Sequence, residues 1–246
     1  LTRVAQARPD GLTIGFASGG LLSLIASSEV PLRLDQFTNL VRVSQDPAIL
    51  IVGANSPIRT LDDVVAGMRR AGGGFSAGAA GPEGALGHLN MNAFADAVRG
   101  EYIYVAYPGA ARVAQALMGG HLDLGLVKPA DVFGQVRNGE LRVVAVLDDT
   151  RLPQLPDVPT TAELGINAFP DGRMVQMTYA VAPAGLPHAM RAAFVALLRE
   201  SVLSPEFQAH ATADAFLADA IAGEELEAAV AGMFQGFQRA YARMRR

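Results

Sequence analysis

The sequence contains no cysteine and no tryptophan, and Lys128 is its only lysine. Without cysteine, the chain can form no disulfide, no catalytic thiolate and no thiolate metal site. Its longest apolar runs, such as residues 48–54, are too short to span a bilayer. We therefore exclude thiol chemistry and a membrane span from residues 1–246.

Metal ligands and enzyme signatures are also scarce. The four histidines lie far apart without a paired ligand spacing, and we interpret each as a buried or capping residue: His88, His121, His188 and His210. Sequence motifs of hydrolases, metalloproteases and nucleotide-binding loops are absent. Adjacent carboxylates, such as Asp62 and Asp63, fit helix starts better than catalysis. We predict no catalytic residue, no metal and no cofactor.

The composition of the 246 residues is that of a globular protein. Half of the residues are hydrophobic and 18% are charged, which excludes a disordered chain. The formal net charge of −4 gives no general attraction to nucleic acid or acidic lipid. The chain starts at Leu1 within an apparent helix, so we expect a processed segment before it, with any signal peptide there.

Strand and helix patterns alternate between residues 56 and 146. Helices are predicted over 60–70, 85–98, 109–118 and 129–137, and strands over 75–77, 102–106, 122–127 and 141–146. Such alternation favours a parallel sheet with right-handed crossovers. Two long extended segments, residues 48–52 and 174–181, bracket this α/β unit and predict two hinge strands between two lobes.

Three junctions between a strand and a helix are rich in small residues. They comprise residues 17–20, 76–84 and 107–110. Ligands of open α/β sheets sit at the carboxyl ends of strands, and helix N-termini there can bind an anion through backbone N–H groups. The alternative is that the glycines only make tight turns. Lys128, which follows a predicted strand, either adds a charge to such a pocket or is a solvated lysine.

Several stretches, in order along the chain, resemble the substrate-binding proteins of tripartite tricarboxylate transporters, also called Bug receptors. These stretches are residues 7–13, 48–57, 104–123, 139–146, 155–165 and 182–187. The run Pro-Asp-Val-Pro-Thr with Ala-Glu-Leu-Gly, residues 156–165, is the most specific of them. The resemblance covers nearly the whole chain.

The resemblance implies an α/β protein of the type II periplasmic-binding-protein fold. Lobe I would comprise residues 1–52 and 176–246, and lobe II residues 53–175. Such a monomeric protein captures a small organic carboxylate in the cleft between its lobes and delivers it to membrane permease subunits. The candidate ligand-binding residues are Ser18, Gly19, Ser76, Gly78, Ala79, Ala80, Gly81, Tyr107 and Lys128.

Two departures from the family pattern concern the predicted site. An N-terminal βαβ unit of the family has no counterpart in residues 1–246, and Pro82-Glu83-Gly84 lengthens the glycine loop. Two other interpretations stay open from the residues. A LysR-type effector-binding domain would need a helix-turn-helix before it, and an α/β hydrolase would need a nucleophile and base that the sequence does not display.

Overall fold

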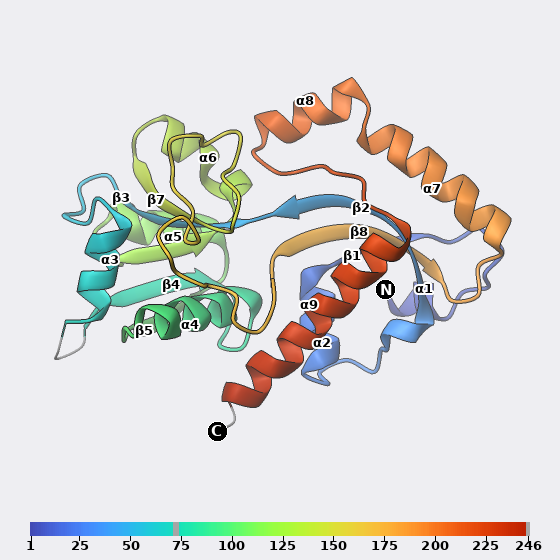
Figure 1. The fold of residues 1–246 in the computed structure, drawn as a ribbon, viewed down its shortest axis with the longest axis horizontal. Helices are drawn as coiled ribbons and strands as arrows, with labels where there is room; N and C mark the ends of the chain where they lie inside the picture. The colour runs from blue at the N-terminus through green and yellow to red at the C-terminus, as the bar shows by residue number, and fades with distance from the viewer. Residues whose placement is uncertain (71–73, 245–246) are drawn as a thin grey trace. The chain divides into compact units, whose positions relative to one another are not determined.

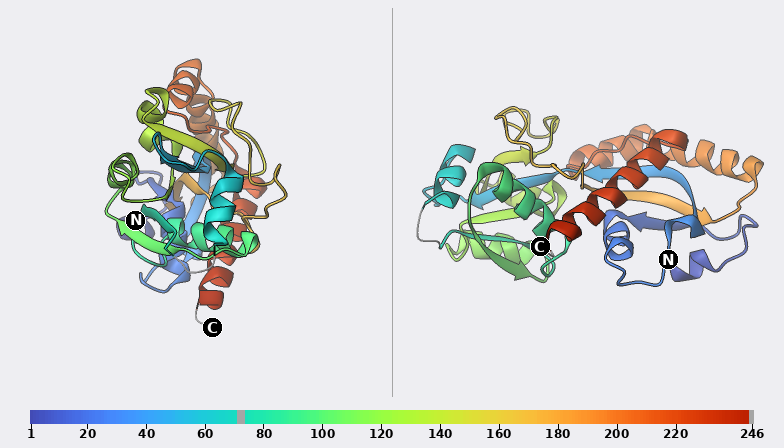
Figure 2. Two further views of the ribbon diagram at one scale, coloured as in Figure 1. Left: turned by 90° about the vertical axis from the view of Figure 1, so that its left-hand side faces the viewer. Right: turned by 60° about the horizontal axis from the view of Figure 1, so that its bottom comes forward.

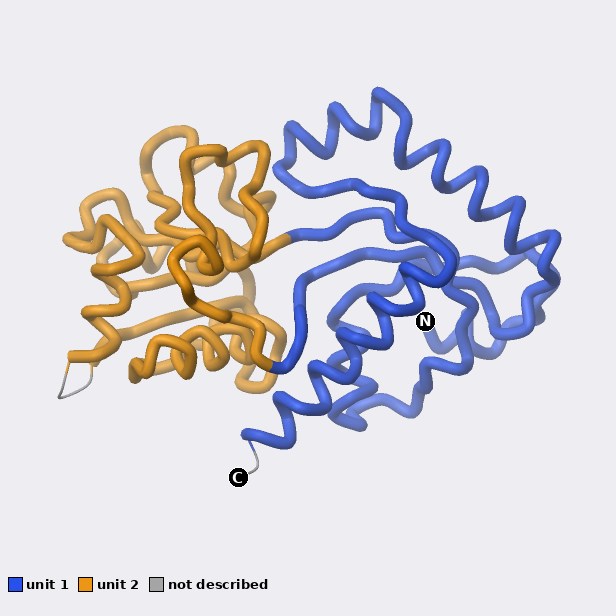
Figure 3. Tube along the Cα trace, in the orientation of Figure 1, with its two compact units in different colours: residues 1–46, 171–246 blue, residues 47–170 orange. Residues whose placement is uncertain are grey.

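The computed structural model describes residues 1–70 and 74–244. Its contacts divide the chain into two compact units, which Figure 3 distinguishes by colour. The first unit comprises residues 1–46 and 171–246, and the second comprises residues 47–170. The chain therefore passes twice between the units, after residue 46 and after residue 170.

The second unit contains a five-stranded sheet in the order β5-β4-β6-β3-β7. The strands are β3 (Ala48–Gly53), β4 (Ser76–Ala80), β5 (Ile103–Tyr107), β6 (Leu124–Val127) and β7 (Leu141–Leu147). β4 pairs in parallel with β5 and β6, as the alternating pattern predicted. The predicted hinge strand over residues 48–52 also belongs to this sheet, where β3 lies antiparallel between β6 and β7.

The helices of the second unit follow its strands in the predicted order. They are α3 (Leu61–Met68), α4 (Leu86–Val98), α5 (Ala110–Met118) and α6 (Pro129–Arg137). α3 starts with the predicted capping box, in which the Asp63 N–H donates to Thr60 and the Asp63 carboxylate accepts from the Thr60 N–H. Apolar side chains from the sheet, including Leu50 and Leu124, pack with Phe94 of α4 in one core.

The first unit contains a three-stranded antiparallel sheet in the order β1-β8-β2. The strands are β1 (Gly15–Ser18), β2 (Phe37–Asp46) and β8 (Gln176–Pro183). Its helices are α1 (Thr2–Ala5), α2 (Gly19–Ala26), α7 (His188–Val202), α8 (Pro205–Ala213) and α9 (Gly223–Met244), with a 3-10 turn, η1 (Leu34–Gln36). The apolar side chains of α9 recur at three- and four-residue spacing and are buried at Leu226, Val230, Met233 and Phe237.

The extended segments predicted as hinges are strands inside the units. Residues 48–52 belong to β3, which pairs on both sides within the sheet of the second unit. Residues 176–181 belong to β8, the middle strand of the first unit's sheet. Figures 1 and 2 let the reader follow both segments within their sheets. In the part of the chain that the structure describes, no helix combines the length and hydropathy needed to cross a membrane.

Candidate functional site

Three parallel strands of the second unit end at one edge of its sheet. Ala80 at the end of β4 lies opposite Tyr107 at the end of β5, and Ala79 lies opposite Leu126 of β6. Gly81 and Lys128 are the residues that continue the chain just beyond these pairs. The fold thus brings four of the predicted site residues, Ala80, Gly81, Tyr107 and Lys128, to a single edge.

Three helices start at this same edge. α4 starts at Leu86, α5 at Ala110 and α6 at Pro129, each shortly after one of the three strands. Their N-cap residues, Ala85, Gly109 and Lys128, make no side-chain capping hydrogen bond. This contrasts with α3, whose Thr60 satisfies a first-turn N–H group. Uncapped helix N-termini carry partial positive charge and attract a carboxylate or phosphate.

The loop between β4 and α4 is held in shape by its neighbours. The Gly81 N–H donates to the Tyr107 carbonyl over 2.9 Å, and the Tyr104 hydroxyl donates to the Gly81 carbonyl over 2.9 Å. The Gly84 N–H donates to Nδ1 of His88, also over 2.9 Å. Gly81 and Gly84 have φ of +104° and +85°, a region that glycine adopts readily. These bonds fix the backbone that leads into the first turn of α4.

His88 is the buried centre of this arrangement. Its ring centroid lies 4.3 Å from that of Tyr104, and its Nε2 lies 3.2 Å from the Asn92 amide. Because Nδ1 accepts the Gly84 N–H, the neutral imidazole carries its proton on Nε2. The Tyr102 hydroxyl donates to Oδ1 of Asn92 over 2.6 Å. Burial lowers the pKa of His88, whereas the charge of Glu83 acts in the opposite direction.

Burial also changes the pKa values of Tyr102 and Tyr104, the two tyrosines beside His88. It raises the pKa of Tyr104 to about 12 and raises that of Tyr102 further. Both hydroxyls therefore stay protonated at neutral pH and can act as hydrogen-bond donors. The side chains that hold the loop are therefore neutral, while Glu83 within the loop carries a negative charge that acts on them.

Lys128 occupies two roles at this edge. It is the N-cap residue of α6, and its Nζ lies 3.7 Å from the Asp131 carboxylate. The Lys128 side chain is 40% exposed. Its charge is thus partly compensated by Asp131 and accessible to solvent. These observations do not decide between a lysine that adds charge to a pocket and a solvated surface lysine.

The structure separates Ser76 from these residues. The strand predicted over residues 75–77 extends to residue 80, so residues 78–80 belong to β4 and not to the predicted loop, and Ser76 stands at the opposite end of that strand. The Ser76 hydroxyl and N–H both donate to the Asp123 carboxylate over 2.8 Å, and the Asp123 N–H donates back to the hydroxyl. These bonds tie the start of β4 to the turn before β6.

Gly78 and Ala79 are buried within β4. A Cβ atom on Gly78 would lie 2.9 Å from the Val105 carbonyl oxygen and 2.9 Å from the Tyr107 ring. Glycine is thus required there because the neighbouring strand and the Tyr107 ring approach closely. Among the residues of this strand, Ala80 is the exposed one at the carboxyl edge.

Ser18 and Gly19 lie in the first unit, where β1 gives way to α2. Ser18 is the N-cap residue of α2 and makes no capping hydrogen bond through its side chain. Gly19 is buried, and a Cβ on it would lie 3.1 Å from the Val175 carbonyl oxygen and 3.4 Å from the Met233 sulfur. This junction resembles the other three in having an uncapped helix start after a strand.

The sequence interpretation missed the residues that hold the loop. His88 was predicted only as a buried or capping residue, which is confirmed, and Tyr104 was not singled out at all. A histidine four residues after the loop glycine, on the first turn of a helix, is the signal that could have indicated the contact. Within residues 1–70 and 74–244, no group of three acidic or histidine side chains is arranged to hold a metal ion.

Comparison with known proteins gives a family and several relatives. The family described as tripartite tricarboxylate transporter family receptor matches residues 1–224. A UPF0065 protein of Bordetella pertussis is 26% identical over 206 residues, which cover 83% of this chain and 62% of that protein. The chain therefore spans less than two thirds of the length of this relative.

Solved structures have the same fold at low sequence identity. A TctC solute-binding protein from Polaromonas superposes with a TM-score of 0.83 at 22% identity, over 98% of this chain and 82% of the other. The protein Rpa4515 of R. palustris, solved with adipate, superposes with a TM-score of 0.78 at 20% identity, over 98% and 80%. The architecture is thus that of periplasmic solute-binding proteins, an α/β fold with two sheets, as predicted. With a family match that extends over most of its length, the chain belongs to the tripartite tricarboxylate transporter receptor family.

Proposed function

We propose that this chain is the solute-binding part of a periplasmic receptor that captures a small organic carboxylate. In this proposal the receptor acts as a monomer, performs no chemistry and delivers its ligand to the membrane permease subunits of a tripartite transporter. The family match supports the receptor role. The adipate in the R. palustris relative supports a carboxylate as the ligand class.

The observation that carries the proposal is the convergence of helix starts at one sheet edge. α4, α5 and α6 direct the positive ends of their dipoles toward the ends of β4, β5 and β6, and no N-cap side chain competes for their first N–H groups. A bound carboxylate would satisfy several such groups at once. Lys128 would add a partly compensated positive charge.

Binding without chemistry fits the partners of the polar groups near this edge. Both ring nitrogens of His88 contact Gly84 and Asn92, and the Ser76 hydroxyl contacts Asp123 at the other end of β4. These groups have structural partners in place of the nucleophile–base contact that a hydrolase needs. No observation favours a LysR-type regulator or a hydrolase over the receptor.

Ala80 offers a direct test, because it is exposed at the edge and its side chain carries no contact that the fold requires. We expect malate or adipate, but not glucose or putrescine, to raise the melting temperature of the chain, since a ligand that binds only the folded state stabilises it. Ala80→Asp would place a negative charge beside the helix starts and weaken binding at least tenfold. Ala80→Asn has the same size without the charge and is the matched control.

Two outcomes would contradict the proposal. One is a melting temperature that no carboxylate raises while neutral or cationic solutes do. The other is equal weakening by Ala80→Asp and Ala80→Asn, which would indicate that size and not charge matters there. The further expectation that the two units close on the ligand is tested by small-angle scattering, as a smaller radius of gyration when the ligand is present.

A further inference from the structure

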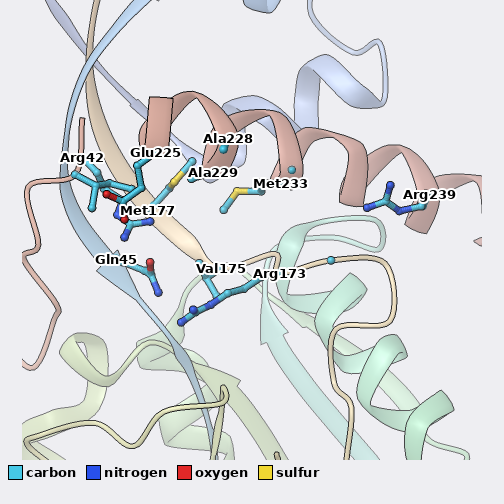
Figure 4. Close-up of a pocket in the computed structure, with 13 residues that line it drawn as sticks. Arg42, Gln45, Arg173, Val175, Met177, Glu225, Ala228, Ala229, Met233 and Arg239 are labelled. Atoms are coloured by element: carbon cyan, nitrogen blue, oxygen red, sulfur yellow. The ribbon is translucent and has the colours of Figure 1, made fainter. Parts of the chain in front are cut away.

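A pocket of about 380 Å³ lies wholly within the first unit, between α9 and the strands β2 and β8. Its apolar side chains include Val175, Met177 and Met233, all of which are buried. Figure 4 shows Gln45 projecting from β2 into the pocket, and Arg42, Arg173 and Glu225 among the polar residues that line it. The pocket therefore combines an apolar floor with charged and amide groups.

An irregularity in β2 brings two polar residues to the same side of the sheet. Arg42 and Gln45 are three positions apart, so in a regular strand their side chains would point to opposite faces. The register between β2 and β8 shifts between Arg42 and Ser44, so that Arg42 lies opposite Tyr179 and Gln45 opposite Met177. Because Tyr179 and Met177 share a face, Arg42 and Gln45 do too.

Gln45 is a polar residue of the lining whose side chain faces the open pocket. The residue is only 5% exposed, and its backbone is paired with Leu217 on β2's free side. Its side-chain amide, by contrast, forms no hydrogen bond with any residue in 1–70 or 74–244. An amide that faces a pocket without a protein partner can offer both its N–H groups and its oxygen to a ligand. The amide is thus aimed at whatever fills the pocket.

The charges of the lining favour an anion. Arg42, Arg173 and Arg239 contribute three positive charges, against one negative charge from Glu225. Arg42 pairs with Asp219 through its Nε, over 3.0 Å, and a terminal nitrogen, but a guanidinium has five N–H donors and keeps others for a ligand. Arg239 donates to the backbone carbonyl of Asp171 over 2.9 Å, and a carbonyl carries no full charge to cancel that of the guanidinium.

Part of the wall that α9 contributes is made of small residues. Ala228, Ala229 and Gly232 line the pocket, and a Cβ on Gly232 would meet no atom within 4 Å. This leaves room for the body of a ligand over the two methionines, whose thioethers adapt to varied apolar shapes. Gln45 and Gly172 stand close to residues 46 and 170, after which the chain passes between units.

We propose that this pocket is a second ligand site, which binds a small organic carboxylate with an apolar body. The Gln45 amide and the arginine N–H groups would bind the carboxylate, and Val175, Met177 and Met233 would contact the apolar body. The site is distinct from the sheet edge of the second unit and would hold its ligand whether or not that ligand is transported.

Gly232 allows a blocking variant that keeps the fold. Gly232→Leu would project a side chain into the open pocket, and leucine is favoured over glycine inside a helix. Gly134→Leu in α6 is the matched control, because Gly134 is also a helical glycine with no atom within 4 Å of a Cβ. Gln45→Leu removes the amide at nearly constant size. Hexanoate and benzoate are the probes, with hexylamine as a cation of similar apolar size.

Isothermal titration of the full chain tests the proposal. We expect hexanoate and benzoate to bind, hexylamine not to bind, and Gly232→Leu and Gln45→Leu to weaken binding at least tenfold while Gly134→Leu leaves it unchanged. Binding of hexanoate should also be unaffected by Ala80→Asp, which separates this site from the proposed transport site. Failure of the parent chain to bind either acid, or equal binding by Gly232→Leu, would overturn the proposal. Loss of malate binding in Ala80→Asp with unchanged hexanoate binding would support two separate sites.

Discussion

His88 holds the loop that leads into α4, so its removal should loosen the sheet edge. His88→Leu retains an apolar side chain against Tyr104 but leaves the Gly84 N–H and the Asn92 amide without the imidazole. A buried polar group that loses its partner costs about 1–3 kcal/mol. Gly84 and Asn92 are half-buried, which places both at the low end of that range. We expect a loss of about 2 kcal/mol, or about 4–8 °C in melting temperature for a chain of this length.

The assay is thermal unfolding followed by circular dichroism, since the chain has no tryptophan to report by fluorescence. His88→Asn is the matched variant, because its Oδ1 can accept the Gly84 N–H near the position of Nδ1 without titrating. It should recover part of the lost stability. A His88→Leu variant as stable as the parent would refute the role of these contacts.

Comparing the parent with His88→Asn also isolates the contribution of His88 titration to the pH dependence of stability. Burial lowers the pKa of His88 in the folded state below the usual 6.5, so the unfolded state binds more protons as pH falls through that value. The contribution of neutral His88 to stability is thus complete above pH 6.5 and decreases below it. The parent should lose stability relative to His88→Asn between pH 7 and pH 5, whereas parallel curves for the two chains would contradict this assignment.

Two substitutions of glycine and one of serine test the remaining structural assignments. Gly78→Ala should destabilise the second unit by about 1–3 kcal/mol, because its Cβ would overlap the Val105 carbonyl and the Tyr107 ring, whereas Gly134→Ala in α6 should stabilise by about 1 kcal/mol. Urea unfolding of both variants would reveal the opposite signs, and a neutral Gly78→Ala would contradict the close approach. Ser76→Ala should cost about 1–2 kcal/mol through its lost bonds to Asp123 yet leave malate affinity unchanged. A tenfold weaker affinity for malate at unchanged stability would instead indicate that Ser76 contributes to ligand binding.

Local patterns predicted most of the second unit. The helices predicted from residues 60 and 129 start there in the structure, with a capping box at Thr60 and a proline in the first turn of α6, because such signals act within one helical turn. The antiparallel place of β3 was not predicted. The apolar run of residues 48–52 shows that the strand is buried but carries no information on its direction or neighbours.

The glycine-rich stretch over residues 76–84 shows which features of the candidate site could not be predicted from the sequence. Residues 78–80 were interpreted as part of a loop, but they continue β4, and Gly78 is small there because the Val105 carbonyl and the Tyr107 ring approach closely. That approach depends on β5, which is distant in the sequence, and only tertiary structure reveals it. Four of the predicted site residues do lie together at one edge: Ala80, Gly81, Tyr107 and Lys128. They were chosen by the rule that ligands sit at the carboxyl ends of strands.

The pocket in the first unit had no sequence signal. Arg42 and Gln45 share a face only because the register of β2 shifts, and a shift of one residue cannot be inferred from an alternating pattern. The α9 residues that line it, Ala228 and Gly232 among them, are too small to stand out in a helical stripe.

The most direct test of the carboxylate site is a titration of the isotopically labelled chain with malate or adipate, followed through its backbone amide resonances. We predict that saturable shifts concentrate on the N–H groups at the starts of α4, α5 and α6 and on Gly81, while the amide of Ser76 at the other end of β4 stays unchanged. Shifts that are absent at these helix starts, or that appear equally at Ser76, would contradict the account.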